Sequence, residues 1–387
     1  MAGIVVKPRA RIYHGHDWVY GTDVRKIFGE PKPGDVVSLK DYKDRPLGSA
    51  IYNPNSQIVA RRFSRRKQDL DLDFFKRRIE RADEVRQRLG FDSVYRVVWS
   101  ESDGLPGVVV DRYEDQFAFQ TQTMAMDQRK DLLVDAIRER FSPSCIIERN
   151  ESPIRAAEGL EPQQSIAIGE PSPKRLKIGN VSFLADLWEG QKTGLYLDQL
   201  DNYQSVAKQA KGQRVLDCFS NQGGFALECA KADAAEVTAI DSSEPALKTA
   251  KENAEAENLE IRFESRNVFD FLKEQESAGT KYDLIILDPP SFTRNRKSLK
   301  DALRGYKEIH LRALKMLEPG GKLATFCCSH HVSAGDFMDV IRDASVDAKR
   351  TLRHVDSYGQ RRDHPIIATI PESEYLRGYC FEVVPAW

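Results

Sequence analysis

The chain has 387 residues, which is long enough for two or three domains, and its formal net charge is −1. Hydrophobic residues make up 41% and charged residues 30%, the mean hydropathy is −0.52, and no apolar run approaches the length of a membrane span. The first residues lack the apolar core of a signal peptide, and the six cysteines include no C-x-x-C pair. The composition therefore indicates neither a disulfide framework nor a metal site, and it favours the cytoplasm.

The N-terminal part is expected to be a small β-barrel followed by a helix. Three short segments with strand character, 35–39, 46–52 and 57–63, are separated by glycines and an Asn-Pro-Asn turn. Residues 69–89 then place apolar side chains along one helical face.

A central α+β unit follows. Strand patterns at 94–99, 107–112 and 116–121 precede a helical stretch at 128–141 and a further strand at 145–149. The loop 170–174 is a candidate boundary, and 177–183 is a candidate hairpin. We expect three domains, with the bounds 1–68, 69–190 and 191–387.

From about residue 195 strands and helices alternate, which predicts a mostly parallel sheet covered on both faces. Strands are expected to begin near 214, 236, 260, 282 and 321, and the expected helices are 197–210, 223–232, 245–257, 267–275, 299–317 and 334–347. His310 lies in one of these helical stretches and is expected at the surface.

The segment 215–225, VLDCFSNQGGF, is typical of a cofactor cradle, because an apolar strand leads through a glycine turn into a helix. The next strand ends in Asp241, whose carboxylate suits a ribose diol. A later strand runs into 288–292, DPPSF, which suits a flat base held near a reactive group. These features point to S-adenosylmethionine and a nucleobase, and the absence of G-x-G-x-x-G argues against a nicotinamide oxidoreductase.

Segments along nearly the whole chain carry a family resemblance. They are 11–20, 103–112, 191–199, 219–225, 288–292, Cys328-Ser329, 363–365 and 374–376. In this order and spacing they resemble the bacterial PUA-domain 23S ribosomal RNA cytosine-C5 methyltransferases. The chain departs from that family in two places: Asn221-Gln222 stand where the family usually has bulkier or hydroxyl residues, and Asn267 stands where it usually has an aspartate.

The resemblance implies a Rossmann-like class I methyltransferase domain preceded by a PUA-like barrel and a central α+β domain. It also implies S-adenosylmethionine as cofactor, no metal, and 23S ribosomal RNA as partner, with no membrane and with a homodimer left open. The expected catalytic residues are Cys328 and Asp288. The expected cofactor-binding residues are Tyr196, Phe219, Ser220, Asn221, Gly223, Gly224, Phe225, Asp241, Ser242, Asn267 and Asp288. The amide oxygen of Asn267 is expected to accept a hydrogen bond from the adenine amino group.

The chemistry needs a nucleophile, since carbon 5 of cytosine attacks a methyl group only after a thiolate has added to carbon 6. Strand 322–329 ends in two adjacent cysteines, and side chains alternate along a strand, so only one can face the site. We assign the nucleophile to Cys328, a packing role to Cys327, and orientation of the base at N3 to Asp288. His330 and His331 follow directly and are interpreted as polar lining, with a direct role as the alternative.

Positive charge is concentrated near the N-terminus. Residues 1–90 hold 20 Lys and Arg against 12 Asp and Glu, a net charge of +8, and the remainder carries −9. This asymmetry predicts contact with a polyanion, with a solvated surface as the alternative. Contact with the RNA backbone is the preferred interpretation of the densest cluster, which is Arg61, Arg62, Arg65, Arg66 and Lys67.

Basic residues also follow the Asp-Pro-Pro segment, and they suit either a phosphate-gripping loop or a solvated helix face. They are Arg294, Arg296, Lys297, Lys300 and Arg304.

Two other functions remain open from the sequence. Asp-Pro-Pro-Ser-Phe is close to the Asp-Pro-Pro-Tyr type of motif that holds an amino group for direct attack, so methylation of a base nitrogen is one alternative. A non-catalytic RNA-binding protein with a relic methyltransferase domain is the other.

Overall fold

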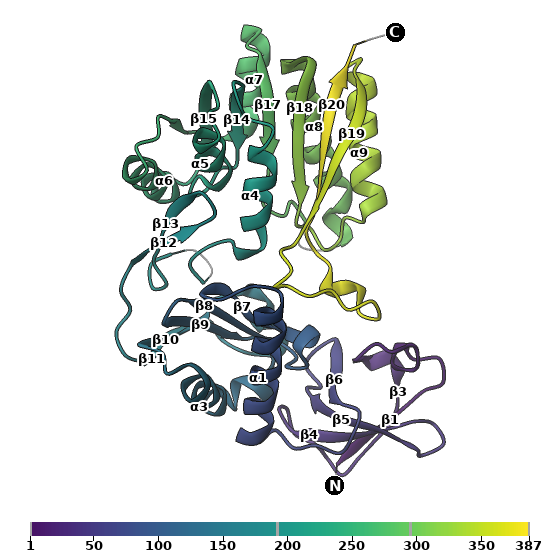
Figure 1. Ribbon diagram of the computed structural model, residues 1–387. Helices are drawn as coiled ribbons and strands as arrows, with labels where there is room; N and C mark the ends of the chain where they lie inside the picture. Colours follow the sequence, from purple (N-terminus) through teal and green to yellow (C-terminus); the bar gives the residue numbers. More distant parts are fainter. Residues whose placement is uncertain (1, 191–192, 294–295, 386–387) are drawn as a thin grey trace. The chain divides into compact units, whose positions relative to one another are not determined.

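The computed structural model describes residues 2–190, 193–293 and 296–385. The chain divides into two compact units, which Figure 1 shows as coloured ribbons. The first unit comprises Met1–Lys174, Ala185–Leu197 and Arg362–Glu374, and the second comprises Arg175–Leu184, Asp198–Arg361 and Tyr375–Trp387. The three-domain bounds expected above stay a prediction. No helix in the described part of the chain is both long and apolar enough to cross a membrane.

A six-stranded sheet forms the N-terminal part of the first unit. Its strands are β1 (Gly3–Val6), β2 (Trp18–Tyr20), β3 (Val24–Phe28), β4 (Val36–Lys40), β5 (Pro46–Tyr52) and β6 (Ile58–Ser64), in the order β2-β6-β5-β4-β1-β3. The strands β4 to β6 confirm the sequence prediction. The first three were missed because β1 and β2 are short and β3 exposes most of its side chains, so none shows a clear alternation.

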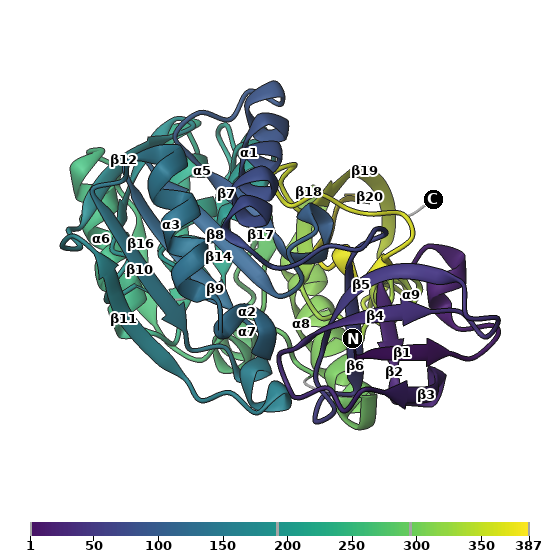
Figure 2. The same cartoon turned by 90° about the horizontal axis from the view of Figure 1, so that it is seen from below.

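A second sheet with helices on one face completes the first unit (Figure 2). Its strands are β7 (Val94–Trp99), β8 (Val108–Tyr113), β9 (Gln116–Thr121), β10 (Cys145–Asn150) and β11 (Gln163–Ile168), and its helices are α1 (Leu72–Arg88), α2 (Met124–Asp127) and α3 (Lys130–Phe141). Asp71 caps α1 by accepting a hydrogen bond from the Phe74 backbone N–H. The α+β order is confirmed, and the half-exposed edge strand β11 was missed.

The second unit is built on a seven-stranded sheet. Its strands are β14 (Arg214–Cys218), β15 (Glu236–Asp241), β16 (Arg262–Ser265), β17 (Tyr282–Leu287), β18 (Leu317–Cys327), β19 (Thr351–Gly359) and β20 (Arg377–Val384), in the order β16-β15-β14-β17-β18-β20-β19. The first five strands in this order are parallel, and β20 pairs antiparallel with both β18 and β19. The predicted parallel sheet is confirmed, but β19 and β20 were missed. A hairpin of β12 (Lys174–Ile178) and β13 (Val181–Ala185) forms a separate small sheet, as the sequence predicted.

Helices cover both faces of this sheet (Figure 1). They are α4 (Leu200–Ala207), α5 (Gly224–Lys231), α6 (Glu244–Ala256), α7 (Val268–Ala278), α8 (Leu299–Met316) and α9 (Ala334–Asp347). Side chains along β14 alternate between the two faces of the sheet, so the strand contacts helices on both sides. Leu216 and Cys218 join the apolar core under α7, α8 and α9, whereas Asp217 faces α5.

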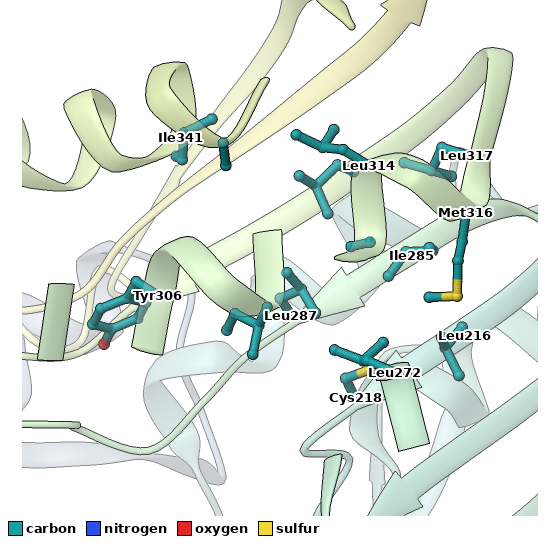
Figure 3. Close-up of a cluster of buried hydrophobic side chains, with 14 of the residues drawn as sticks. Leu216, Cys218, Leu272, Ile285, Leu287, Tyr306, Leu314, Met316, Leu317 and Ile341 are labelled. Atoms are coloured by element: carbon teal, nitrogen blue, oxygen red, sulfur yellow. The ribbon is translucent and has the colours of Figure 1, made fainter. Parts of the chain in front are cut away.

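That core contains buried side chains from α8, which Figure 3 shows with Tyr306 and Leu314 among the labelled residues. His310 lies one turn beyond Tyr306 and is 0% exposed, so the prediction of a surface histidine was wrong. Its Nδ1 lies 2.6 Å from the Tyr306 carbonyl oxygen and its Nε2 lies 2.8 Å from Thr325 Oγ1. The helical spacing from Tyr306 was the signal for this burial, because residues four apart share a helix face.

Burial lowers the pKa of His310 from its ordinary value of 6.5 to about 4. The folded state therefore holds the neutral imidazole, and its contribution to stability is present above pH 6.5 and is lost as the pH falls toward 4. Between pH 7 and pH 4.5 we expect the wild type to lose about 2–3 kcal/mol more stability than the His310→Gln protein. The free energy of unfolding at each pH is measured by urea titration, with hydrogen exchange of peptides from β18 as the readout. His354→Gln, at an exposed histidine, is the control, and equal pH dependence in the wild type and His310→Gln would contradict the assignment.

Candidate active site

The parallel strands of the second unit all end at one edge of the sheet, and the predicted site residues follow those ends. β14 leads into the loop Phe219–Gly223, β15 ends in Asp241, and Asn267 stands shortly after β16. Asp288 directly follows β17, and Cys328 directly follows β18. The structure therefore brings these residues to one edge of the sheet. This is the edge at which open α/β sheets bind their ligands.

The loop after β14 has an unusual backbone. Phe219, Asn221 and Gly223 have φ values of +64°, +48° and +82°, a left-handed conformation that is uncommon outside glycine. Gly224 begins α5 so close to Tyr203 that an added Cβ would lie 2.3 Å from the tyrosine ring. Phe225, the next residue, is buried against Tyr203 with ring centroids 4.6 Å apart. A bulkier residue at 224 would displace the ring, so the packing of α5 requires this glycine.

Hydrogen bonds tie this loop to the end of β15. Asp241 Oδ2 accepts from the Asn221 backbone N–H at 2.9 Å, and Asp241 Oδ1 accepts from the Ser243 N–H at 2.8 Å. The two amides hold the carboxylate in one orientation at the sheet edge. Ser242, the neighbouring candidate, is exposed.

Asn267 caps α7. Its side-chain Oδ1 accepts from the backbone N–H groups of Phe269 at 2.9 Å and Asp270 at 3.4 Å. The oxygen expected to receive the adenine amino group therefore already accepts hydrogen bonds within the helix cap, and the expected contact with adenine stays a prediction. The remaining side-chain group is the NH₂, which can donate to a ring nitrogen.

Three buried polar atoms around the β14 loop make no hydrogen bond among the described residues: Asp217 Oδ1, Ser220 Oγ and Gln222 Oε1. Asp217 is 0% exposed, and its Oδ2 accepts from the Ala226 N–H at 3.0 Å. Burial raises the pKa of Asp217 well above its usual range, and the negative charges of Asp288 and Asp241 add to this effect. Unpaired buried polar atoms are costly, so this cluster indicates a place for a polar ligand.

Asp217 and Gln222 were not among the predicted site residues. The signal for Asp217 was in the sequence, because an acidic residue stands inside an otherwise apolar strand. The contact of the Gln199 side chain with the site was also not predicted. Its Nε2 donates to Asp288 Oδ2 at 3.0 Å. No local pattern marks Gln199, since the contact joins residues 89 positions apart.

The Asp-Pro-Pro segment and the end of β18 lie together. Cys328 Sγ lies 3.8 Å from the Pro289 carbonyl oxygen, and the hydroxyls of Ser291 and Ser329 lie 2.9 Å apart. The Tyr306 hydroxyl is 3.1 Å from Ser329 Oγ and comes from α8. These contacts position the backbone on either side of Cys328.

The two adjacent cysteines have different surroundings. Cys327 is 1% exposed and belongs to the apolar core, whereas Cys328 is partly exposed. His330 is exposed, with its ring centroid 5.7 Å from that of Tyr375, and His331 is also exposed. Cys327 is the last residue of β18 and joins the apolar core, whereas Cys328 lies just beyond the end of the strand.

Some predicted residues belong to the first unit or lie outside the described residues. Tyr196 belongs to the first unit, so its expected role in cofactor binding stays a prediction. Residues 191 and 192 of the predicted leading segment, and Arg294 of the basic loop, lie outside the described residues. Arg304 lies in α8 and pairs with Asp301 at 3.2 Å on the exposed face of that helix, which favours the solvated helix face for this residue.

The N-terminal basic cluster divides into two groups. Arg62 is 7% exposed and pairs with Asp17 at 2.7 Å, and Arg61 pairs with Glu101 at 2.7 Å. The prediction that both side chains reach RNA is corrected, because internal carboxylates hold them. Arg65, Arg66 and Lys67 are exposed.

Two family matches cover most of the chain. Residues 4–65 match PUA-like domains, and residues 168–367 match S-adenosylmethionine-dependent methyltransferases. The expected PUA-like domain and the expected cofactor are thereby confirmed.

Full-length relatives agree with these matches. The ribosomal RNA large subunit methyltransferase I of Erwinia tasmaniensis is 36% identical and that of Vibrio vulnificus strain CMCP6 is 38% identical; the alignments cover 98% of this chain and 99% and 98% of those proteins. A solved S-adenosylmethionine-dependent methyltransferase from Streptococcus mutans has the same fold, with a TM-score of 0.85, 21% identity, and coverage of 99% of this chain and 100% of that one. This chain is an S-adenosylmethionine-dependent methyltransferase, and it belongs to the family of the ribosomal RNA large subunit methyltransferase I enzymes.

Proposed function

We propose that this enzyme transfers a methyl group to carbon 5 of a cytosine in 23S ribosomal RNA, in the cytoplasm, through a covalent adduct between Cys328 and carbon 6. The observation that carries the proposal is the place of Cys328. Cys328 is partly exposed and its thiol lies beside the Asp-Pro-Pro segment, while Cys327 is buried in the core. The full-length relatives named as ribosomal RNA methyltransferases support the choice of substrate.

The residues at the sheet edge fit S-adenosylmethionine. Asp241 would accept the ribose hydroxyls, since its carboxylate is oriented by two backbone amides and retains lone pairs. The unpaired atoms of Asp217 and Ser220 suit the polar amino acid end of the cofactor. Asn267 would donate its NH₂ to the adenine ring. Bound there, the cofactor supplies an electrophilic methyl group on a sulfonium.

Cys328 would act as the nucleophile in its thiolate form. When its sulfur adds to carbon 6, the electron pair of the 5,6 double bond makes carbon 5 able to take the methyl group. The proton on carbon 5 must then leave to a base, and the carbon 6–sulfur bond breaks to restore the double bond and the thiolate. Asp288 would orient the base at N3, and Gln199 holds its carboxylate from the other side.

Methylation of a base nitrogen is the competing chemistry for an Asp-Pro-Pro segment. It needs no cysteine, because an amino group attacks the methyl directly. The partly exposed thiol of Cys328 at the site favours the carbon-5 reaction, and the cysteine variants below separate the two.

Replacing Asp241 by Ala should weaken the binding of S-adenosylhomocysteine by about 1.5–3 kcal/mol, because two hydroxyls lose a charged acceptor. Calorimetric titration measures the change. Asp339→Ala, at an exposed aspartate on α9, is the matched control and should bind as the wild type does. Equal affinities of the two variants would remove Asp241 from the cofactor site.

Replacing Cys328 by Ala should abolish methylation and leave cofactor affinity nearly intact, since only a small, partly exposed group is removed. Cys327→Ser should keep much of its activity, with some loss of stability from a hydroxyl placed in the apolar core. Turnover is measured on protein-free 23S ribosomal RNA with a labelled methyl donor.

RNA that carries 5-fluorocytosine provides a direct readout of the adduct. Fluorine cannot leave as a proton does, so the wild type and Cys327→Ser should be trapped covalently, and Cys328→Ala should not. Near-normal turnover by Cys328→Ala would contradict the mechanism and favour a base-nitrogen target.

A further inference from the structure

A cavity of about 680 Å³ lies within the first unit, and none of its lining residues is a candidate cofactor residue. β6 and α1 line it, together with the 3₁₀ turn Ser100–Asp103 and residues between 365 and 370. Its charged lining consists of four arginines and three carboxylates: Arg62, Arg65, Arg78, Arg81, Asp17, Glu101 and Asp103. The function proposed above gives this cavity no role.

All three carboxylates are already paired. Asp17 pairs with Arg62 at 2.7 Å. Glu101 pairs with Arg61 at 2.7 Å and accepts from the Trp18 indole N–H. Asp103 accepts from two guanidinium nitrogens of the fully buried Arg86, at 2.5 and 2.8 Å. The acidic side of the cavity is therefore neutralised by groups that belong to the fold.

Three of the lining arginines form no ion pair of this kind in the described part of the chain. Among the described residues, Arg65, Arg78 and Arg81 make no ion pair with a carboxylate. Arg78 is half-buried: its guanidinium donates to the Phe63 carbonyl oxygen at 2.8 Å and lies 5.2 Å from the centre of the Phe74 ring. Burial lowers the pKa of Arg78, and the neighbouring positive charges of Arg81 and Arg77 lower it further, while the negative charges of Asp103 and Asp17 act against this shift. The cavity is thus a partly buried site lined by more arginines than carboxylates.

We propose that this cavity binds a backbone phosphate and its nucleotide from the RNA substrate, at a second contact point outside the methylation site. The proposal rests on the proposed function, since it takes the same RNA as ligand. Guanidinium groups match the geometry of phosphate oxygens and remain charged at any physiological pH.

The shape of the cavity supports a nucleotide rather than a small anion. Its volume lies within the range of sites that enclose small organic ligands. Phe63, Ile367 and Ile370 contribute apolar lining, against which a sugar or base can pack. Since β6 belongs to the PUA-like domain, the cavity adjoins a fold that the resemblance assigns to RNA binding.

The test compares arginine variants of the full-length protein on protein-free 23S ribosomal RNA. Arg65→Gln/Arg81→Gln removes two exposed charges from the cavity, and Arg78→Gln removes the half-buried one. Arg88→Gln, at an exposed arginine on the same helix and outside the cavity lining, is the control. Filter binding between 50 and 300 mM KCl gives the affinity and its salt dependence.

We expect Arg65→Gln/Arg81→Gln to bind RNA at least tenfold more weakly than Arg88→Gln. The slope of log affinity against log salt should become shallower by about 0.7–0.9 for each phosphate that the variant no longer neutralises. Affinity for S-adenosylhomocysteine and the melting temperature should match those of the control, because the exposed arginines hold no internal carboxylate. If Arg78→Gln melts early, the exposed pair alone decides the result.

Two outcomes would overturn the proposal. One is an RNA affinity and salt slope of Arg65→Gln/Arg81→Gln equal to those of Arg88→Gln. The other is arginine-dependent binding of free CMP in calorimetry with unchanged RNA affinity, which would assign the cavity to a small phosphorylated ligand.

The proposed function is tested separately, by the formation of 5-methylcytosine. If the wild type forms no 5-methylcytosine but the cavity variants still bind RNA more weakly than the control, the methylation proposal fails and the phosphate site stands. If the wild type forms 5-methylcytosine and RNA affinity does not depend on these arginines, the methylation proposal stands and the phosphate site fails.

Discussion

The parallel register of β14, β15, β17 and β18 is the constraint on which the active site depends. Cys218 pairs with Ile240 on one side and with Leu287 on the other, and Leu287 pairs with Thr325. These pairings bring the ends of four strands to one level, although the residues that follow them are far apart in the chain. Because the strand ends are aligned, short loops suffice to present Asp241, Asp288 and Cys328 at the same edge.

Much of the local chemistry at that edge is held at a cost to folding. Phe219 and Asn221 adopt left-handed backbone conformations, and Asp217 keeps one carboxylate oxygen buried without a partner among the described residues. Such features persist where surrounding packing determines them, and here the packing is that of α5 against Tyr203 and the hydrogen bond from Asn221 to Asp241. A bound ligand can relieve the unpaired polar atoms, so the same features that weaken folding favour binding.

Arginines around the cavity of the first unit fall into two classes, according to whether they form an ion pair with a carboxylate. Arg61, Arg62 and Arg86 hold internal carboxylates and join the sheet, α1 and the 3₁₀ turn into one body. Buried pairs of this kind are costly to break singly, because the remaining charge stays in a poorly solvated place. Arg65, Arg78 and Arg81 lie beside them and form no ion pair in the described part of the chain, which is the basis of the proposed phosphate site. Net charge alone did not distinguish these classes.

The amino-acid sequence by itself determined the alternation of strands and helices, the glycine turn after β14, the acidic end of β15 and the burial of only one of the two adjacent cysteines. These are local properties, since each depends on side-chain period or on turn chemistry within a few residues. Only the tertiary structure decided that β20 enters the sheet antiparallel, that Gln199 holds Asp288, and which basic residues are held by internal carboxylates. Each of these depends on groups that are distant in the chain and meet only after folding, so no pattern along the sequence records them.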